Sequence, residues 1–430
     1  MKVLICDDIE KRATRWRSAL EPLGSHLELA DNPDDDEVVE AIISLEKRRD
    51  VARLRREHKR LEFGPTDESD VGHNLFDDVD MVVLDYDLFW LGADSEAESH
   101  PLPTRPRVTG EQLAYLVRCF SRCAYIVGLN QFGENPFNLD LRGHVGSYAD
   151  LNIGGVQLGN PGLWGETVVG FRPSAWPNLA DVVQAQKQRI EFLADRMTQP
   201  VLPTLGLIEN GYPTVPREAL EFFGGLDPTT MTFAEFAVSG TPRGLDITDA
   251  PWEPAALIRI AASRVAKWLE REVLAGGEVL VDRPHLVERF PSLLGDGVKD
   301  LAAFDLGAYP RPESSLVDHP AAAAALFENG FWLSRPAWWW QRLAVDHRIA
   351  EVKDPWDGEE PPVRFCEDVS RFLPQEACLT YSADVHSPWV TRHVAGPKPL
   401  SQALGVAPEL YEGPFSLSEV VYEPSDVLER

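Results

Sequence analysis

Short apolar runs alternate with amphipathic stretches through the first 150 residues, and this alternation constrains the fold more than any other feature. Strand-like runs occupy residues 1–6, 27–30, 79–84 and 124–129, and a fifth is expected near 145–151. Parallel strands need a crossover of a dozen or more residues, usually a helix. Strands and helices in alternation therefore predict an α/β domain built on a doubly wound parallel sheet.

Three of the intervening stretches have helical character. Residues 9–20 carry apolar side chains at intervals of three or four, and residues 110–120 follow Thr109, a good helix N-cap. Residues 34–60 hold aliphatic side chains among dense charges. This last pattern predicts a long, solvent-exposed helix inserted into the domain.

The composition changes after this domain. Residues 151–178 are rich in Gly, Pro and Trp, which is typical of a connection or an elaborated loop. Beyond them, amphipathic helices are predicted at 179–197 and 254–275. We therefore predict a domain over residues 1–150, a connection over 151–178, and a larger C-terminal domain of unknown type, mainly helical or α+β, over 179–430.

The overall charge excludes some function classes. The chain has 41 basic and 69 acidic residues and a net charge of −28, which argues against general electrostatic binding of nucleic acid or an anionic membrane. No window approaches 18 uninterrupted apolar residues, and the start shows no secretory cleavage pattern. The five cysteines are scattered and form no CxxC pair, as expected for reduced thiols in a cytoplasmic protein.

Acidic residues stand at the ends of two predicted strands. Asp7 and Asp8 follow the first strand, and Asp85 follows the third, with Asp87 two residues later. The carboxyl ends of parallel strands meet at one edge of the sheet, where carboxylates repel each other unless a cation joins them. These oxygen ligands suit Mg²⁺, which would also prepare a carboxylate to accept a phosphoryl group.

At these residues the sequence resembles the receiver domain of two-component response regulators. The resemblance lies in KVLICDD, in DMVVLDYDL, and in the IVGLN strand after a TG-capped helix, and it covers about the first 150 residues. It implies a flavodoxin-like fold and a signalling role in a phosphorelay, with a histidine kinase or phosphotransfer protein as partner. Asp85 would form the aspartyl phosphate, Asp7, Asp8, Asp85 and the Asp87 carbonyl would hold Mg²⁺, and Asn130 occupies the switch Thr/Ser position.

One element of the receiver pattern is missing. Receivers place a lysine after the fifth strand, but this chain has no lysine between Lys59 and Lys187. Arg142 or Arg172 are the alternative cations that the sequence offers. The absence also favours a second hypothesis, in which a degenerate, unphosphorylated receiver serves as a protein-docking module, for example in a stress or antiviral defence system.

The C-terminal part offers no recognised output. No basic helix-turn-helix follows residue 180, so the output is expected to be a contact with other proteins rather than with DNA, and a turnover enzyme is the less favoured interpretation. A third hypothesis places an enzyme site in one polar region. Its members are Cys366, Glu367, Asp368, Asp384, His386, Arg392 and His393. Asp384 and His386 alternate with an apolar residue, which favours a structural role over a Cys/His or Asp/His site.

Overall fold

The computed structural model describes residues 1–7, 10–23, 27–31, 33, 35–59, 73–86, 108–130, 139, 141, 145–165, 173–224, 226–239, 254–290, 323–344, 359–360, 362–381 and 391–396. Asp8 and Asp87, predicted as metal ligands, lie outside these ranges. Within the described residues, no helix combines the length and the apolar character needed to cross a bilayer.

The N-terminal part contains a five-stranded parallel sheet with the order β2-β1-β3-β4-β5. Its strands are β1 (Lys2–Cys6), β2 (Glu28–Leu29), β3 (Met81–Asp85), β4 (Tyr125–Leu129) and β5 (Leu151–Ile153). All residues of β3 and β4 are buried, as expected for a parallel sheet covered on both faces. The predicted α/β sheet is confirmed. Its strand order is one that doubly wound domains use, and the finer flavodoxin-like assignment stays a prediction.

The fifth strand differs from its predicted position. We expected it near residues 145–151, but β5 begins only at Leu151. The preceding residues form turns that are tied to helix α3 (Gly110–Phe120) through Glu111, whose carboxylate accepts hydrogen bonds from Ser147 Oγ (3.0 Å) and Tyr148 N (2.8 Å). Backbone that is hydrogen-bonded to a side chain in this way is not available to a strand ladder, so the strand starts later.

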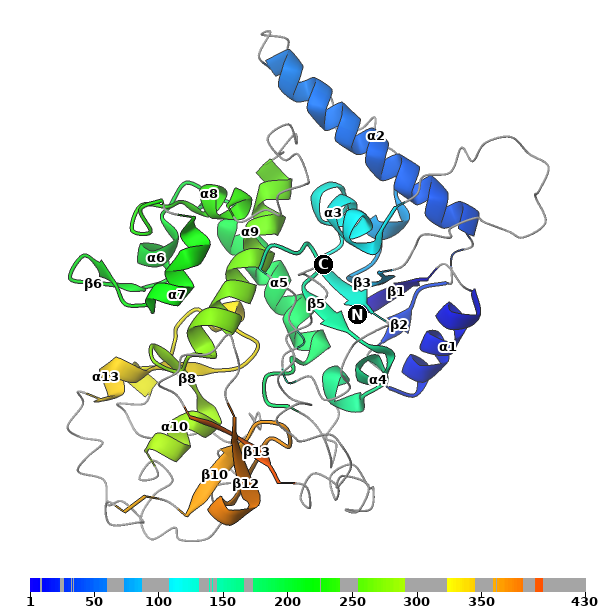
Figure 1. Ribbon diagram of the computed structural model, residues 1–430. Coiled ribbons are helices and arrows are strands. Elements are labelled where there is room, and N and C mark those ends of the chain that lie inside the picture. Colours follow the sequence, from blue (N-terminus) through cyan, green and yellow to red (C-terminus); the bar gives the residue numbers. More distant parts are fainter. Residues whose placement is uncertain are drawn as a thin grey trace.

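Helices cover both faces of the sheet (Figure 1). They are α1 (Glu10–Leu20), α2 (Asp35–Lys59), α3 (Gly110–Phe120) and α5 (Leu179–Leu193). α1 and α5 share one apolar cluster with the strand residues Val3, Val83 and Val127. α2 and α3 share another with Val82 and Ile126. The alternation of side chains along each strand separates the two clusters.

The long helix α2 is less exposed than its sequence predicts. Its apolar residues Val38, Ile42 and Leu45 are buried in the cluster that contains α3. Arg48 anchors its middle, because the guanidinium donates to Asp77 (2.6 Å) and to the carbonyl of Phe120 (2.8 Å). The remainder of the helix extends beyond the sheet (Figure 1).

A helix from the C-terminal part completes the face covered by α3. α9 (Pro254–Trp268) packs beside α3, and its Arg259 donates hydrogen bonds to the carbonyls of Arg118 (2.8 Å) and Cys119 (2.6 Å). No helix is found among the described residues between β4 and β5, where a doubly wound fold would place one. The apolar cluster on this face therefore contains residues from both sides of the predicted connection at residues 151–178.

The rest of the described C-terminal part combines helices with small sheets. α9 continues into the π-helical turn η7 (Leu269–Leu274). β6 (Ile208–Glu209) and β7 (Tyr212–Pro213) form a hairpin, and β8 (Leu280–Asp282) pairs with the distant β9 (Ala337–Trp339) in a two-stranded antiparallel sheet. A sheet of order β11-β10-β13-β12 is built from β10 (Val363–Cys366), β11 (Arg371–Pro374), β12 (Cys378–Tyr381) and β13 (Arg392–Ala395). The short helices are α4 (Gly155–Leu158), α6 (Val201–Thr204), α7 (Arg217–Leu220), α8 (Phe233–Val238), α10 (Arg283–Arg289) and α13 (Trp340–Ala344).

Candidate functional site

Two of the predicted acidic residues meet at the carboxyl edge of the sheet. β1 and β3 are neighbours with Cys6 opposite Leu84, so Asp7 and Asp85 follow in adjacent positions. Asp85 is 2% exposed and Asp7 is 9% exposed. Side chains alternate along a strand, and both residues fall on the face covered by α1. The edge thus holds two buried carboxylates that point to the same helix.

Arg12 places a positive charge beside Asp85. It lies in the first turns of α1, and its Nη1 atom is 3.4 Å from Oδ2 of Asp85. Sequence reasoning missed this residue, although a helix that follows β1 directly must begin at the carboxyl edge. Arg142 and Arg172, the cations that the sequence suggested, both lie outside the described residues.

Asn130 also lies at this edge. It follows β4 directly, and its backbone N–H donates to the carbonyl of Ile153 on β5 (2.8 Å). Its side chain is partly exposed. The structure therefore places Asn130 at the carboxyl end of β4, the strand next to β3.

Trp16 of α1 packs against Gly155, the first residue of α4. β5 is followed by Gly154 and Gly155, and a Cβ atom on Gly155 would lie only 2.1 Å from the Trp16 ring. A side chain at residue 155 is therefore excluded unless Trp16 moves. The close packing of α1 on the start of α4 could not be predicted from the sequence.

On the opposite face of the same edge, Tyr86 is locked in place. Its ring lies across Gly128, where a Cβ atom would come within 2.3 Å of it. Its hydroxyl donates to Oδ1 of Asn152 (2.6 Å). Gly110, the first residue of α3, lies directly against the backbone of Asp85 and Tyr86. A Cβ atom on Gly110 would lie only 2.4 Å from the carbonyl oxygen of Asp85, so glycine is needed at this close approach. The residue after Asp85 is thus held by β4, β5 and α3 together.

The donor set at the edge is compatible with a magnesium ion. Mg²⁺ in proteins is usually held by one or two carboxylates together with waters and substrate phosphates. Asp7 and Asp85 supply two such carboxylates, whereas no group of three or more metal-ligating side chains occurs in the described part of the chain. Asp7 and Asp85 are therefore the residues that would hold the ion.

In the C-terminal polar region, Glu367 lies just after β10 and contacts Arg392 of the predicted set together with residues from outside it. Glu367 Oε1 is 2.8 Å from Nε2 of His285 and accepts from Nε of Arg392 (2.6 Å), and Oε2 accepts from Ser174 Oγ (2.6 Å). Nδ1 of His285 contacts Asp282. Asp384 and His386 lie outside the described residues.

The protonation of this cluster follows from its geometry. Burial alone would lower the pKa of His285, but the negative charges of Asp282 and Glu367 raise it to about 9. Burial would raise the pKa of Glu367, but Arg392 and His285 hold it well below its usual range. Both imidazole nitrogens face carboxylate oxygens, so the ring is a cation with two donors. The arrangement is a closed ion network, which agrees with the structural role favoured by the sequence.

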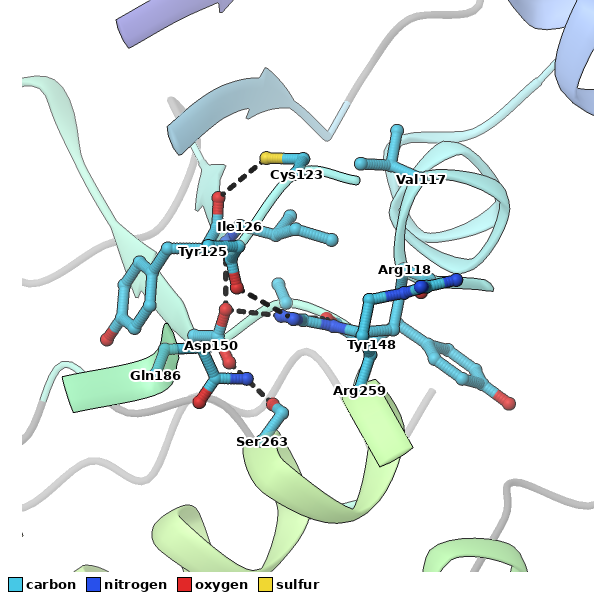
Figure 2. Close-up of polar contacts among 12 residues, drawn as sticks. Val117, Arg118, Cys123, Tyr125, Ile126, Tyr148, Asp150, Gln186, Arg259 and Ser263 are labelled. Carbon is cyan, nitrogen blue, oxygen red and sulfur yellow. Dashed lines mark hydrogen bonds and ion pairs between the residues drawn. The ribbon is translucent and has the colours of Figure 1, made fainter. Parts of the chain in front are cut away.

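A second buried network joins the sheet to α9, and sequence reasoning missed it entirely (Figure 2). Asp150, just before β5, contacts the guanidinium of Arg118 and accepts from the backbone N–H of Ile126 (2.8 Å) and from Ser263 Oγ of α9 (2.5 Å). Arg118 also donates to the carbonyl of Ala124 (3.0 Å). Asp150 thus connects α3, β4 and α9 at the amino edge of the sheet, away from Asp85.

A small cavity of about 20 Å³ adjoins Asp150 and is also lined by Arg189, Lys267 and Glu270. Such a space suits a single water molecule. Lys267 donates to the carbonyls of Ser147 and Ala149 (2.8 Å for Ala149). Burial lowers the pKa of Lys267 to about 7. The cavity is too small for an organic substrate, so the carboxyl edge remains the better candidate.

No protein-family model, curated protein or solved structure matches this chain.

Proposed function

We propose that the protein is an atypical receiver-like signalling protein that accepts a phosphoryl group on Asp85. The observation that carries the proposal is the pair of buried carboxylates, Asp7 and Asp85, on adjacent strands of a sheet ordered β2-β1-β3-β4-β5. Functional side chains of doubly wound sheets gather at this edge. The protein would act in the cytoplasm, with a phosphohistidine protein as donor and other proteins as targets of its C-terminal part.

In the proposed reaction, a carboxylate oxygen of Asp85 attacks the phosphorus of a phosphohistidine. The phosphorus–oxygen bond forms as the phosphorus–nitrogen bond breaks, and the electron pair of that bond returns to the imidazole nitrogen. Mg²⁺ bound at Asp7 and Asp85 would neutralise charge on the transferring oxygens. Asp7 contributes the second carboxylate for this purpose.

Arg12 takes over part of the role of the receiver lysine in this proposal. Its guanidinium reaches Asp85 from α1 rather than from the end of β5. Guanidinium groups pair well with both carboxylate and phosphoryl oxygens. The ion pair with Asp85 would therefore be exchanged for contacts to the phosphoryl group, and α1 would sense the modification.

Phosphorylation of the full chain by a small donor tests the proposal. The protein is incubated with phosphoramidate and Mg²⁺, and intact mass is measured. One added phosphoryl group is expected on the wild type and none on Asp85→Asn. Asp80→Asn is the matched control, because Asp80 lies at the other end of β3, paired with Lys187 (2.5 Å), and should be modified like the wild type. An unmodified wild type would sink the proposal.

A second candidate function is a docking module without phosphorylation. The ion pair of Asp85 with Arg12 favours it, because the carboxylate already has a partner within the protein. It predicts that Asp85→Asn keeps full activity in its host. Loss of activity in that variant, together with phosphate on the wild type, would support the receiver function over the docking module.

A further inference from the structure

Two cysteines that are distant from the carboxyl edge meet inside the C-terminal sheet. Cys366 is the last residue of β10, and Cys378 is the first residue of β12. Their sulfur atoms are 3.3 Å apart. The turn between β11 and β12 brings them together, because Sγ of Cys378 also lies 3.2 Å from the carbonyl oxygen of Pro374. Their spacing of twelve residues gave no hint of this contact.

The two thiols are not equivalent. Cys366 is fully buried, whereas Cys378 is partly exposed. The hydrogen bond from the Cys366 thiol lowers the pKa of Cys378, and the same contact together with burial raises the pKa of Cys366. The accessible sulfur is therefore the better thiolate, and the buried sulfur stands directly behind it. A nucleophilic cysteine beside a resolving cysteine is the arrangement that redox-active pairs require.

The other three cysteines lack these properties. Cys6, Cys119 and Cys123 are all buried, and burial raises the pKa of each to about 12. The thiolate is the reactive form of cysteine, so these residues should be inert toward a mild oxidant. They provide internal controls within the same chain.

We propose that Cys366 and Cys378 are a redox-active dithiol that closes to a disulfide when hydrogen peroxide reacts with the protein. The Cys378 thiolate attacks one peroxide oxygen, the O–O bond breaks, and the departing hydroxide takes up a proton to give water. Cys378 is then a sulfenic acid. The Cys366 sulfur attacks the Cys378 sulfur, and its thiol proton leaves with the hydroxyl group as a second water.

The sulfur atoms lie close to bonding distance, although β13 separates β10 from β12 in the sheet. A disulfide needs the sulfur atoms about 2.05 Å apart, so they must approach by only about 1 Å. The closed loop would contain Glu367, which holds the network of His285 and Arg392. Oxidation would thus tie β10 to β12 around the residue on which the C-terminal ion network depends. A cross-link of this kind restricts the unfolded chain, so the oxidised protein should melt at a higher temperature.

Counting free thiols in the full chain tests the inference. The protein is treated with hydrogen peroxide, unfolded, alkylated with N-ethylmaleimide and weighed. All five cysteines should be alkylated before treatment, and two fewer afterwards, with recovery after reduction by dithiothreitol. Peptide mapping without reduction should find Cys366 joined to Cys378.

Two variants separate this pair from general oxidation. Cys378→Ser should keep all its remaining thiols alkylatable after peroxide, and because Cys378 is partly exposed the variant should fold. Cys119→Ser is the matched control, and peroxide treatment should still remove two of its alkylatable thiols. Full alkylation of the treated wild type would overturn the inference. So would oxidation of Cys378 to a sulfinic acid without cross-linking, or loss of two thiols in Cys378→Ser.

Discussion

The carboxyl edge and the ion network around Glu367 both bury carboxylates beside arginines, but they hold them differently. Asp85 meets Arg12 at 3.4 Å, and the Arg12 side chain is 31% exposed. Glu367 is held by His285, Arg392 and Ser174, all within 2.8 Å. The first pair can exchange partners with solvent or a ligand. The second cannot do so without breaking several short contacts.

This difference distinguishes an ion pair that can change partners during a reaction from networks that stabilise the fold. Breaking a buried ion pair leaves an uncompensated charge in the interior, which is strongly destabilising. A partly exposed pair contributes little to stability, so it can change during a reaction at small cost. Tight networks therefore hold the C-terminal part and its contact with the sheet, whereas the loose pair lies at the edge where a phosphoryl group would arrive.

The largest effect is expected at the tight network in Figure 2. Asp150→Ala removes the carboxylate that Arg118 contacts in the interior, where Arg118 is fully buried. We expect the free energy of unfolding to fall by about 3–5 kcal/mol, measured by urea denaturation. The exposed Asp195, beside Arg196, gives the control: Asp195→Ala should change it by less than about 0.5 kcal/mol. Equal losses in both variants would remove the distinction between the two kinds of pair.

A smaller effect is expected from the titration of His285. Its pKa is raised to about 9 in the folded protein by Asp282 and Glu367, against 6.5 as the ordinary value. The folded state therefore binds more protons than the unfolded state between these values, and unfolding becomes easier as the pH rises. The contribution is complete below pH 6.5 and is lost as the pH rises through about 9. It amounts to at most about 3 kcal/mol.

Comparison with His285→Gln isolates this contribution from that of Lys267. Burial lowers the pKa of Lys267 to about 7, which makes folding more favourable as the pH rises above that value. Both proteins carry Lys267, so it cancels in the difference between their unfolding free energies. That difference should shrink between about pH 6 and about pH 10. A constant difference across this range would mean that His285 does not titrate as its contacts require.

Substitution of Arg12 is expected to have the smallest effect on stability. It should nevertheless slow the phosphorylation of Asp85 clearly. Arg12→Ala should change the free energy of unfolding by less than about 1 kcal/mol, because the pair is partly exposed. The rate of phosphorylation of Asp85 should fall about tenfold or more, since a hydrogen bond to a charged group contributes about 1.5–3 kcal/mol. Lys11→Ala, an exposed change on the same helix, should leave the rate unchanged. Faster phosphorylation of Arg12→Ala would mean that Arg12 blocks the pocket.

The parts that the sequence predicted are those with local signals. The apolar runs of β1 and β3 end on Asp7 and Asp85, so the pairing of these acids followed from the parallel sheet alone. The start of α3 was also predicted, because Thr109 caps it through a hydrogen bond from Gln112 N. These signals lie within a few residues of the structures that they specify.

What could not be predicted depends on contacts between distant residues. Three contacts leave no periodic pattern in the sequence: Trp16 with Gly155, Asp150 with Ser263, and Cys366 with Cys378. The fifth strand was placed too early because Glu111 ties the preceding residues into turns. In each case tertiary packing determines the local structure, and the local sequence pattern does not indicate that packing.

The position of α9 affects how such a chain can change in evolution. Multidomain proteins often exchange whole modules, which requires that each module folds by itself. Here the sheet receives part of its cover from α9, more than a hundred residues further along the chain. The two halves cannot be swapped independently: a new C-terminal half would have to bring its own version of α9, with a serine for Asp150 and an arginine for the end of α3.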